Sequence, residues 1–241
     1  MLIRIKVIMS DKAMSRETMD AREEMLRAAL SSDAEVSVDC IKKGPDELDC
    51  NTDEAFAAAE MVKESIRAEK EGFDAIVIYC FSDVGLDAIR ENVRIPVIGP
   101  GETSLAAASM LCNRFTVLTS ESINIPRTYR RLMKNGIARE KMVSVRALDI
   151  PTGELRSNPK ATEEYLRKVC AKAVMEDGAD GIILGCLGMA GYGKEIEQEL
   201  PIKVIDPAFV AVAYAEMCVR TGLTHITAVY PVFENNSHVE L

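Results

Sequence analysis

The sequence contains an internal repeat, and this repeat constrains the fold more than any other feature. Short apolar segments recur in the two halves of the chain in the same order, with offsets of 106, 107 and 110 residues. Such a repeat predicts two similar structural units rather than one continuous sheet. The matched segments are residues 74–80 (DAIVIYC) with 180–186 (DGIILGC), 95–100 (IPVIGP) with 202–207 (IKVIDP), and 7–10 (VIMS) with 117–120 (VLTS).

Runs of β-branched residues alternate with longer segments of helical periodicity along the whole chain, which is typical of parallel strands joined by crossover helices. The predicted fold class is therefore α/β. Gly136, Gly178 and Gly222 fit helix ends, and Pro126 and Pro207 fit first helical turns. We expect strands at 2–9, 35–40, 74–79, 97–98, 114–118, 142–148, 181–184 and 203–205, and helices at 15–30, 51–71, 83–92, 103–113, 127–135, 161–177, 193–200 and 208–220.

The repeat assigns four predicted strands to each half of the chain. We therefore expect two pseudo-symmetric lobes, each with a four-stranded, mainly parallel sheet and flanking helices. Lobe 1 is predicted to be discontinuous, with residues 1–99 and 207–241, and lobe 2 to span residues 100–206. Ligands bind beyond the carboxyl ends of the strands in open parallel sheets. This rule predicts an active site in the cleft between the lobes.

Two of the seven cysteines, Cys80 and Cys186, occupy equivalent positions in the repeat, each after a predicted buried strand and before a predicted helix. A helix N-terminus lowers the pKa of a thiol from its ordinary value of about 8.5 toward neutrality. If both thiols face one acidic carbon, one can remove its proton while the other returns a proton on the opposite face. This two-base chemistry inverts a stereocentre and needs no cofactor.

A packing role is the alternative for any of these thiols, because free cysteine is among the most buried residue types. We assign Cys40, Cys112, Cys170 and Cys218 to packing and Cys50 to an incidental surface position. A duplication could also have retained a packing cysteine in both halves, so the repeat leaves that alternative open for the equivalent pair.

Residues near the ends of the repeated strands are candidates for binding a small-molecule substrate. Their hydroxyl or backbone N–H groups could donate hydrogen bonds to a substrate carbonyl or oxyanion, and the last two could line the site through backbone and side-chain bulk. The structural alternatives are turn and helix-cap roles. The candidates are Ser10, Ser82, Asp83, Thr119, Ser120, Gly188 and Met189.

Five ordered segments of the chain resemble the aspartate/glutamate/hydantoin racemase superfamily, and its hydantoin racemase branch most. The resemblance implies a two-lobed pseudo-symmetric fold and cofactor-independent stereoinversion. It places Cys80 and Cys186 in the positions of that family's two catalytic thiols. The segments are residues 79–88 (YCFSDVGLDA), 96–102 (PVIGPGE), 115–119 (FTVLT), 184–189 (LGCLGM) and 204–207 (VIDP).

Departures from the family pattern bear on the substrate. Phe81-Ser82 and Leu187-Gly188 follow the two cysteines, where the amino-acid racemase branch has Asn-Thr and Thr-His. This difference favours a cyclic, less charged substrate such as a 5-substituted hydantoin or allantoin. Ser10 stands where hydantoin racemases tend to show Asn-Pro-Asn, so the substrate stays open.

Three alternatives to this function remain at this point. An aspartate/glutamate-type amino-acid racemase would use both thiols on a free amino acid. An enzyme like maleate isomerase or arylmalonate decarboxylase would need only one thiol. A non-enzymatic two-lobed protein that binds a small molecule would need neither.

The composition excludes several function classes. A net charge of −9 provides no basic surface for nucleic acid or an anionic membrane, and no apolar run is long enough to span a bilayer. Neither CxxC nor HExxH spacing occurs, so we expect no metal and no cofactor. Seven cysteines and a charged N-terminal segment favour a reducing cytoplasm. Residues 224–241 are predicted to form an edge strand or an interface segment of a homo-oligomer.

Overall fold

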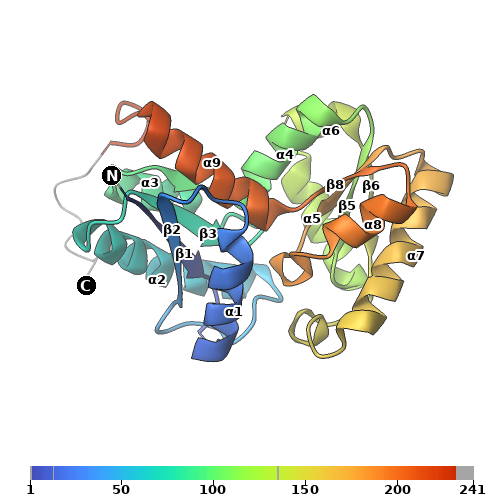
Figure 1. Ribbon diagram of the computed structural model, residues 1–241, viewed down its shortest axis with the longest axis horizontal. Coiled ribbons are helices and arrows are strands. Elements are labelled where there is room, and N and C mark those ends of the chain that lie inside the picture. The colour runs from blue at the N-terminus through green and yellow to red at the C-terminus, as the bar shows by residue number, and fades with distance from the viewer. Residues whose placement is uncertain (1, 13, 135, 232–241) are drawn as a thin grey trace. The chain divides into compact units, whose positions relative to one another are not determined.

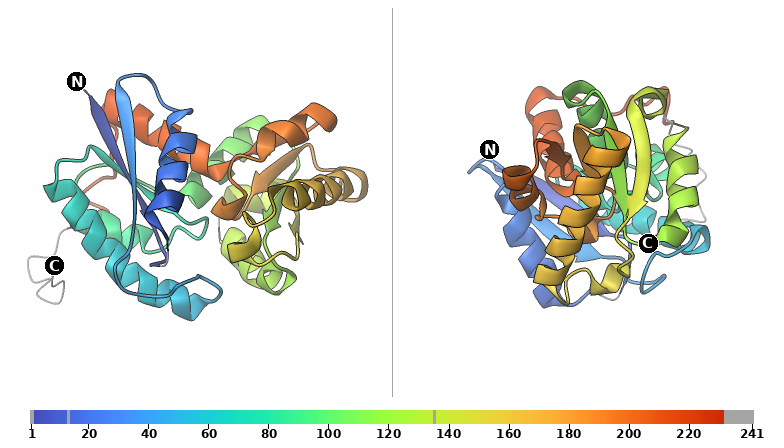
Figure 2. Two further views of the ribbon diagram at one scale, coloured as in Figure 1. Left: turned by 60° about the horizontal axis from the view of Figure 1, so that its bottom comes forward. Right: turned by 90° about the vertical axis from the view of Figure 1, so that its right-hand side faces the viewer.

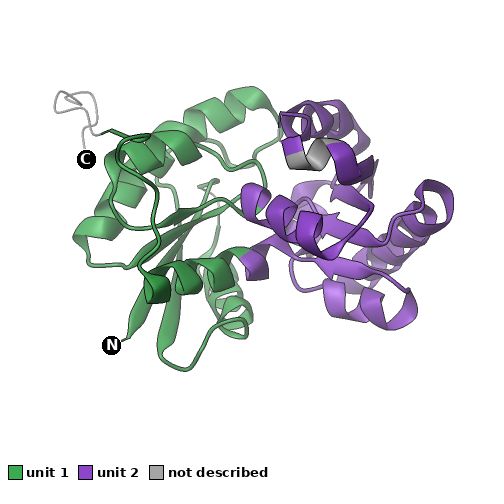
Figure 3. Ribbon diagram, turned by 90° about the horizontal axis from the view of Figure 1, so that it is seen from above, with its two compact units in different colours: residues 1–100, 211–241 green, residues 101–210 purple. Residues whose placement is uncertain are grey.

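The structure, a computed structural model, describes residues 2–12, 14–134 and 136–231. The chain divides into two compact units, shown in different colours in Figure 3. Unit 1 comprises Met1–Pro100 and Ala211–Leu241, and unit 2 comprises Gly101–Val210. The chain thus leaves unit 1 once and returns to it at its C-terminal end.

Unit 1 is built on a parallel sheet with the strand order β2-β1-β3-β4. Helices α2 and α3 cover one face of this sheet, and α1 lies on the other face (Figures 1 and 2). The register pairs Met9 with Tyr79 at the carboxyl ends of the two central strands. The elements are β1 (Ile3–Met9), α1 (Arg16–Arg27), β2 (Ala34–Cys40), α2 (Asn51–Lys70), β3 (Ala75–Tyr79), α3 (Leu86–Asn92) and β4 (Val97–Ile98).

Unit 2 repeats this arrangement, because its parallel sheet has the strand order β6-β5-β7-β8. Helices α7 and α8 pack on one face of the sheet. The strands are β5 (Phe115–Thr119), β6 (Met142–Ala147), β7 (Gly181–Leu184) and β8 (Lys203–Ile205). The helices are α4 (Pro100–Leu111), α5 (Ile125–Leu132), α6 (Gly136–Lys141), α7 (Pro159–Asp177) and α8 (Gly193–Glu199), with 3-10 turns η1 (Ser122–Asn124), η2 (Thr152–Glu154) and η3 (Leu187–Met189). Helix α9 (Pro207–Thr221) begins in unit 2 and continues into unit 1 from Ala211 onward.

The predicted α/β fold with two four-stranded parallel sheets is confirmed. The central strands can be recognised in the sequence because they are buried along their whole length: every residue of β3 and of β5 is buried. A parallel sheet covered by helices on both faces requires apolar residues at successive positions rather than at alternate ones. In unit 1 the core under α2 and α3 contains Ile8, Ile76 and Ile78 from the sheet and Met61 and Ile89 from the helices.

Local capping fixes several helix ends, and one of them, at Gly178, was expected from the sequence. The Ser15 side chain accepts a hydrogen bond from the Thr18 N–H at the start of α1, with a distance of 3.1 Å. The Asn158 side chain does the same for Ala161 at the start of α7. Gly178 ends α7 with a φ of +66°, in the left-handed region where glycine has no steric penalty.

Two sequence predictions of helix ends are wrong. Gly136 begins helix α6 rather than ending a helix, and Lys141 anchors the end of α6 by donating to Ser109 O (2.5 Å) and Cys112 O (2.9 Å). Helix α3 begins at Leu86 and not at Asp83, because Asp83 and Gly85 both have positive φ values, +53° and +72°.

The C-terminal segment also differs from the prediction over its described part. Residues 224–231 form turns and irregular structure rather than an edge strand, and residues 232–241 lie outside the described residues. Polar contacts hold this segment beside α3: Thr224 Oγ1 donates to Arg94 O (3.2 Å), and His225 Nε2 lies 2.9 Å from Val93 O. The expected strand is therefore wrong for residues 224–231, and the alternative of an interface segment stays a prediction.

Candidate active site

The candidate thiol of unit 1 lies at the carboxyl end of the central strand β3. Cys80 is half-buried, and its thiol interacts with the Ser82 N–H, the Ser82 hydroxyl and the Ser10 hydroxyl. Ser10 follows β1, which pairs with β3, so the two residues come together at neighbouring strand ends. The structure therefore brings the candidate residues Ser10, Cys80 and Ser82 together.

The electrostatics of Cys80 differ from the sequence expectation. Burial raises the pKa of the Cys80 thiol, and the hydrogen bonds from Ser82 and Ser10 oppose part of that rise because they favour the thiolate. Glu54 adds to the rise through its negative charge. The predicted lowering by a helix N-terminus is wrong here, since α3 has only seven residues and begins at Leu86.

Two acidic side chains surround the loop after Cys80. Ser82 Oγ donates to Glu54 Oε1 from helix α2 at 2.8 Å. The Asp83 carboxyl lies over Gly99, because a Cβ added at Gly99 would lie 2.6 Å from Asp83 Cγ. Asp83 therefore does not begin α3, and its side chain lies against the end of β4. Glycine at position 99 is what leaves room for its carboxylate.

The candidate thiol of unit 2 has the same position in its own sheet. Cys186 is half-buried and follows β7, and the chain then turns through η3, with the Met189 N–H donating to Cys186 O at 2.9 Å. A Cβ at Gly188 would lie 3.4 Å from Cys186 Sγ and 2.7 Å from Leu155 Cδ1. Glycine at position 188 thus keeps the space beside the sulfur open.

The predicted substrate-binding residue Met189 lies in this loop. It is fully buried and belongs to the core of unit 2, together with Leu184, Tyr192 and Ile196. Its role toward a substrate stays a prediction.

The loop after Cys186 is held by two charged residues that sequence reasoning missed. Arg156 stacks over the Tyr192 ring and donates to Gly188 O at 2.9 Å and also to Ala190 O. The buried Asp206 carboxylate accepts the Gly191 N–H at 2.7 Å. Burial raises the pKa of Asp206, and its backbone N–H donors and Arg156 oppose part of that rise.

The hydroxyl residues after β5 are partly engaged elsewhere. Ser120 is buried and its Oγ lies 3.1 Å from Thr152 Oγ1. The Thr119 carbonyl accepts the Leu148 N–H (3.0 Å), and the Ser120 carbonyl accepts the Ile150 N–H (3.1 Å). Ser10 thus contacts the thiol of its unit, and the equivalent Ser120 forms a hydrogen bond with Thr152.

Each unit also places one carboxylate between its cysteine loop and the end of its last strand. In unit 1 this carboxylate is Asp83, which comes from the cysteine loop and lies over Gly99. In unit 2 it is Asp206, which comes from the end of β8 and reaches the N–H of Gly191. The sequence signal was present, because position 206 is the repeat equivalent of position 99.

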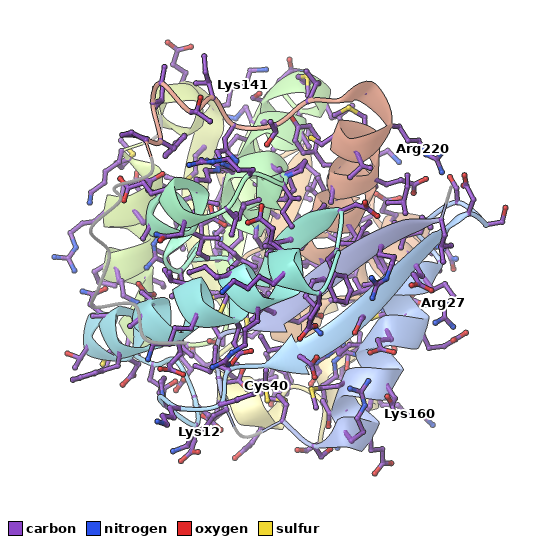
Figure 4. All side chains as sticks on the ribbon, turned by 90° about the vertical axis from the view of Figure 1, so that its left-hand side faces the viewer. Lys12, Arg27, Cys40, Lys141, Lys160 and Arg220 are labelled. Carbon is purple, nitrogen blue, oxygen red and sulfur yellow. The ribbon has the colours of Figure 1, made fainter. Side chains whose placement is uncertain are left out.

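The other cysteines fit the packing roles expected of them. Cys112, Cys170 and Cys218 are buried, and burial raises the pKa of Cys170 to about 12. Cys40 is half-buried at the carboxyl end of β2, as Figure 4 shows, and burial raises its pKa. Cys50 is exposed. Cys80 and Cys186 thus share a half-buried position at the end of a central strand.

Among the described residues, no group of three or more His, Cys, Asp or Glu side chains is arranged to hold a metal ion. Within residues 2–12, 14–134 and 136–231, no helix is both long enough and apolar enough to cross a membrane.

Comparison with solved structures defines the class of protein. An allantoin racemase from Klebsiella pneumoniae superimposes with a TM-score of 0.89 at 30% identity, covering 97% of this chain and 94% of that one. An allantoin racemase from Pseudomonas fluorescens gives a TM-score of 0.88 at 27% identity, over 96% of this chain and 97% of that one. The fold is therefore the α/β fold of these racemases.

Sequence comparison identifies the family. A hydantoin racemase of Pseudomonas sp. (strain NS671) is 34% identical over 200 residues, which cover 83% of this chain and 80% of that relative. The family model described as Asp/Glu/Hydantoin racemase matches residues 14–215. The chain belongs to this family, and it is an isomerase.

Proposed function

We propose that this isomerase inverts the stereocentre of a 5-substituted hydantoin, allantoin or a related amino-acid derivative, with Cys80 and Cys186 as its two bases. The observation that carries the proposal is the equivalence of the two thiols. Each follows the third strand of a four-stranded parallel sheet with the same strand order, and each is half-buried. The names of the relatives, hydantoin racemase and allantoin racemase, support the substrate class.

The proton transfers follow from the two thiols. One cysteine, as thiolate, takes the proton from the ring carbon next to a carbonyl, and the C–H electron pair moves into an enolate. The other cysteine, as thiol, then gives its proton to the opposite face of the same carbon. Afterwards the first cysteine is a thiol and the second a thiolate, so the enzyme is in the protonation state that accepts the other enantiomer.

The environment of Cys80 suits this role in the proposal. Hydrogen bonds from Ser10 and Ser82 stabilise its thiolate, whereas burial keeps its pKa high. A raised pKa makes the thiolate a stronger base toward a weakly acidic carbon. Ser10 and Ser82 therefore support the charged form without making it so stable that it no longer takes a proton.

The residues that follow the thiols favour an uncharged ring. Phe81 and Leu187 are 5% and 4% exposed, so apolar side chains occupy the positions directly after both cysteines. Buried apolar groups give no hydrogen bonds to an α-ammonium or α-carboxylate, and leaving either charge unpaired is costly. A hydantoin ring has neither charge, which makes free aspartate or glutamate the weaker candidate.

The test replaces each thiol separately by serine, with Cys50→Ser as the matched control at an exposed cysteine. Optical rotation follows racemisation, and NMR in D₂O follows exchange of the ring hydrogen, with each enantiomer of 5-benzylhydantoin and of allantoin. We expect Cys80→Ser and Cys186→Ser each to lower racemisation by about 10³-fold or more, since proton transfer contributes on that order. The control should keep the wild-type rate.

Exchange of the ring hydrogen in D₂O distinguishes two-base chemistry from one-thiol chemistry and from simple binding. In the two-base reaction, a single variant can still exchange hydrogen with the one enantiomer that its remaining thiol deprotonates. Full racemisation in either serine variant would refute the two-base proposal and favour chemistry with one thiol. Binding of the ring without any exchange in the wild type would favour a binding protein.

A further inference from the structure

Helix α2 contacts the loop that carries Cys80 at two points that lie one helical turn apart. Near the start of the helix, Glu54 Oε1 accepts a hydrogen bond from Ser82 Oγ at 2.8 Å. Four residues later, Ala58 lies against the end of the same loop, since a Cβ added at Gly85 would be 3.4 Å from Ala58 Cβ. Residues four apart share one face of a helix, so this face of α2 holds Glu54 at the cysteine loop.

The loop forms a tight turn that joins the thiol to this helix. The Asp83 N–H donates to Cys80 O at 3.0 Å, which closes a turn over Phe81 and Ser82. Within the turn, the Ser82 N–H and the Ser82 hydroxyl both interact with the Cys80 thiol. Ser82 is therefore the residue that links the Cys80 thiol to the Glu54 carboxylate.

The Ser82 hydroxyl has a single hydrogen, and this limits the contacts that it can make. While Cys80 is a neutral thiol, the hydroxyl donates to Glu54 and its oxygen can accept the S–H hydrogen. Once Cys80 is a thiolate, two anions compete for the one hydroxyl hydrogen. Donation to the sulfur removes a hydrogen bond from Glu54, and donation to Glu54 leaves the sulfur with fewer donors. In either case the thiolate is disfavoured relative to the thiol.

Glu54 acts on Cys80 through its charge as well as through Ser82. Burial raises the pKa of the Cys80 thiol most, and the negative charge of Glu54 adds to that rise. Four other charged side chains of α2, of the loop and of α3 have partners of their own. They are Asp53 with the Cys50 N–H, Asp83 over Gly99, Asp87 with Tyr230 Oη, and Arg90 with Val97 O.

We propose that Glu54 is a positioning residue for the proton transfer at Cys80 and acts through the hydroxyl of Ser82. This inference rests on the proposed function and assigns a role to a residue outside the cysteine loop. When Cys80 takes the ring proton, the S–H bond forms, the C–H electron pair stays in the enolate, and the Ser82 hydroxyl turns back to Glu54. The return of that hydrogen bond favours the protonated cysteine, so Cys80 is a stronger base with Glu54 than without it.

The test measures alkylation of Cys80 by iodoacetamide as a function of pH, resolved by peptide mass spectrometry. Glu60→Gln is the matched control for Glu54→Gln, because it removes the same charge from α2 at a residue that pairs with Lys63 at 2.8 Å. We expect Glu54→Gln to move the midpoint of the Cys80 profile to lower pH by about one unit, the lower end of the effect of a nearby charge. Glu60→Gln should leave the midpoint in place.

The rates on either side of the midpoint distinguish this role from a loosened loop. Below both midpoints, Glu54→Gln should have about tenfold more thiolate with about threefold lower nucleophilicity, so its Cys80 should be alkylated about threefold faster. Above both midpoints only the lower nucleophilicity remains, and alkylation should be about threefold slower. A loop that is merely loosened would expose the thiol and raise the rate at every pH.

The Cys186→Ser background isolates the reaction at Cys80, because only one of the two proposed bases is then left to take the ring proton. In that background, Glu54→Gln should slow exchange of the ring hydrogen in D₂O by about threefold above the alkylation midpoint, since a weaker base takes the proton less readily. In a Ser82→Ala background, Glu54→Gln should move the alkylation midpoint by less than it does in wild type, because the link through the hydroxyl is absent.

An unmoved midpoint in Glu54→Gln, an equal shift in Glu60→Gln, or an undiminished shift in the Ser82→Ala background overturns the inference. If the midpoint moves as expected but the wild type exchanges no ring hydrogen, the proposed function fails while the link from Glu54 to Cys80 stands. If racemisation needs both thiols but the midpoint does not move, the proposed function stands and this inference fails. Glu54→Ala serves where Glu54→Gln does not fold.

Discussion

Gly185→Ala tests how the sheet of unit 2 positions its thiol. Gly185 joins β7 to Cys186, and a Cβ added there would collide with the backbone oxygen Leu118 O and lie 2.7 Å from Val117 Cγ1. Both atoms belong to β5, the central strand that pairs with β7. A backbone oxygen in the middle of a sheet cannot rotate away, so the chain carrying Cys186 has to move instead.

The size of the effect follows from this geometry. Overpacking a buried site destabilises a protein by about 1–3 kcal/mol, and a clash with backbone belongs at the upper end, about 3 kcal/mol. In a chain of this length, 1 kcal/mol corresponds to about 2–4 °C in Tm, which predicts a fall of about 6–12 °C. Circular dichroism during heating and in urea measures both quantities.

A matched control and a local readout complete the experiment. Gly136→Ala has no atom within 4 Å of the added Cβ and lies in helix α6, so it should stabilise the protein by about 0.4–1 kcal/mol. Alkylation by iodoacetamide, resolved by peptide mass spectrometry, should change in rate at Cys186 more than at Cys80. A loss below about 0.5 kcal/mol for Gly185→Ala would place it among ordinary surface changes and refute the reasoning.

Three further predictions concern the charged and polar groups of the two units. Ser10→Ala removes a hydrogen bond that favours the thiolate, so the pH profile of Cys80 alkylation should move to higher pH, whereas Ser120→Ala should leave it in place. Asp206→Asn replaces one acceptor oxygen by an NH₂ group, which cannot accept from the backbone N–H groups of Gly191 and Ala208. Denaturant unfolding should show that the free energy of unfolding falls by about 1–3 kcal/mol. A smaller fall would mean that the loop does not depend on this carboxylate. Burial raises the pKa of Asp11 to about 6 from its ordinary 3.8, so the folded protein binds this proton more tightly than the unfolded chain. The protonated Asp11 therefore contributes its full stabilisation below about pH 4, and this stabilisation is lost as the pH rises through 6. Asp11→Asn should flatten that part of the curve of Tm against pH.

Much of the fold could be predicted because its determinants are local and repeated. The observed bounds of β7 and β8 are those expected from the sequence, since buried parallel strands read as short continuous apolar runs. The start of α3 could not be predicted in this way. Asp83 takes a positive φ where its carboxylate packs over Gly99, and that contact joins residues far apart in the chain.

The candidate site was predictable only in part, for a related reason. The two cysteines and Ser10 lie at strand ends, and the strand order of a parallel sheet brings such residues together. Arg156 and Asp206 hold the loop after Cys186 from other segments of the chain, and no spacing in the sequence links Arg156 to that cysteine. Their partners are mostly backbone groups and one ring, which give no pattern of residue types to recognise.

In unit 1 the carboxylate comes from the cysteine loop, whereas in unit 2 it comes from the end of the last strand. Positions 83 and 99 are therefore interdependent, and so are position 206 and the loop around Gly191. An acid placed at position 99 while Asp83 is present would force two carboxylates into one small space. Transferring the pattern of one half onto the other therefore requires an ordered pair of substitutions, in which the acid at position 83 is removed before an acid is introduced at position 99. Neither position can be exchanged between the halves without regard to the other.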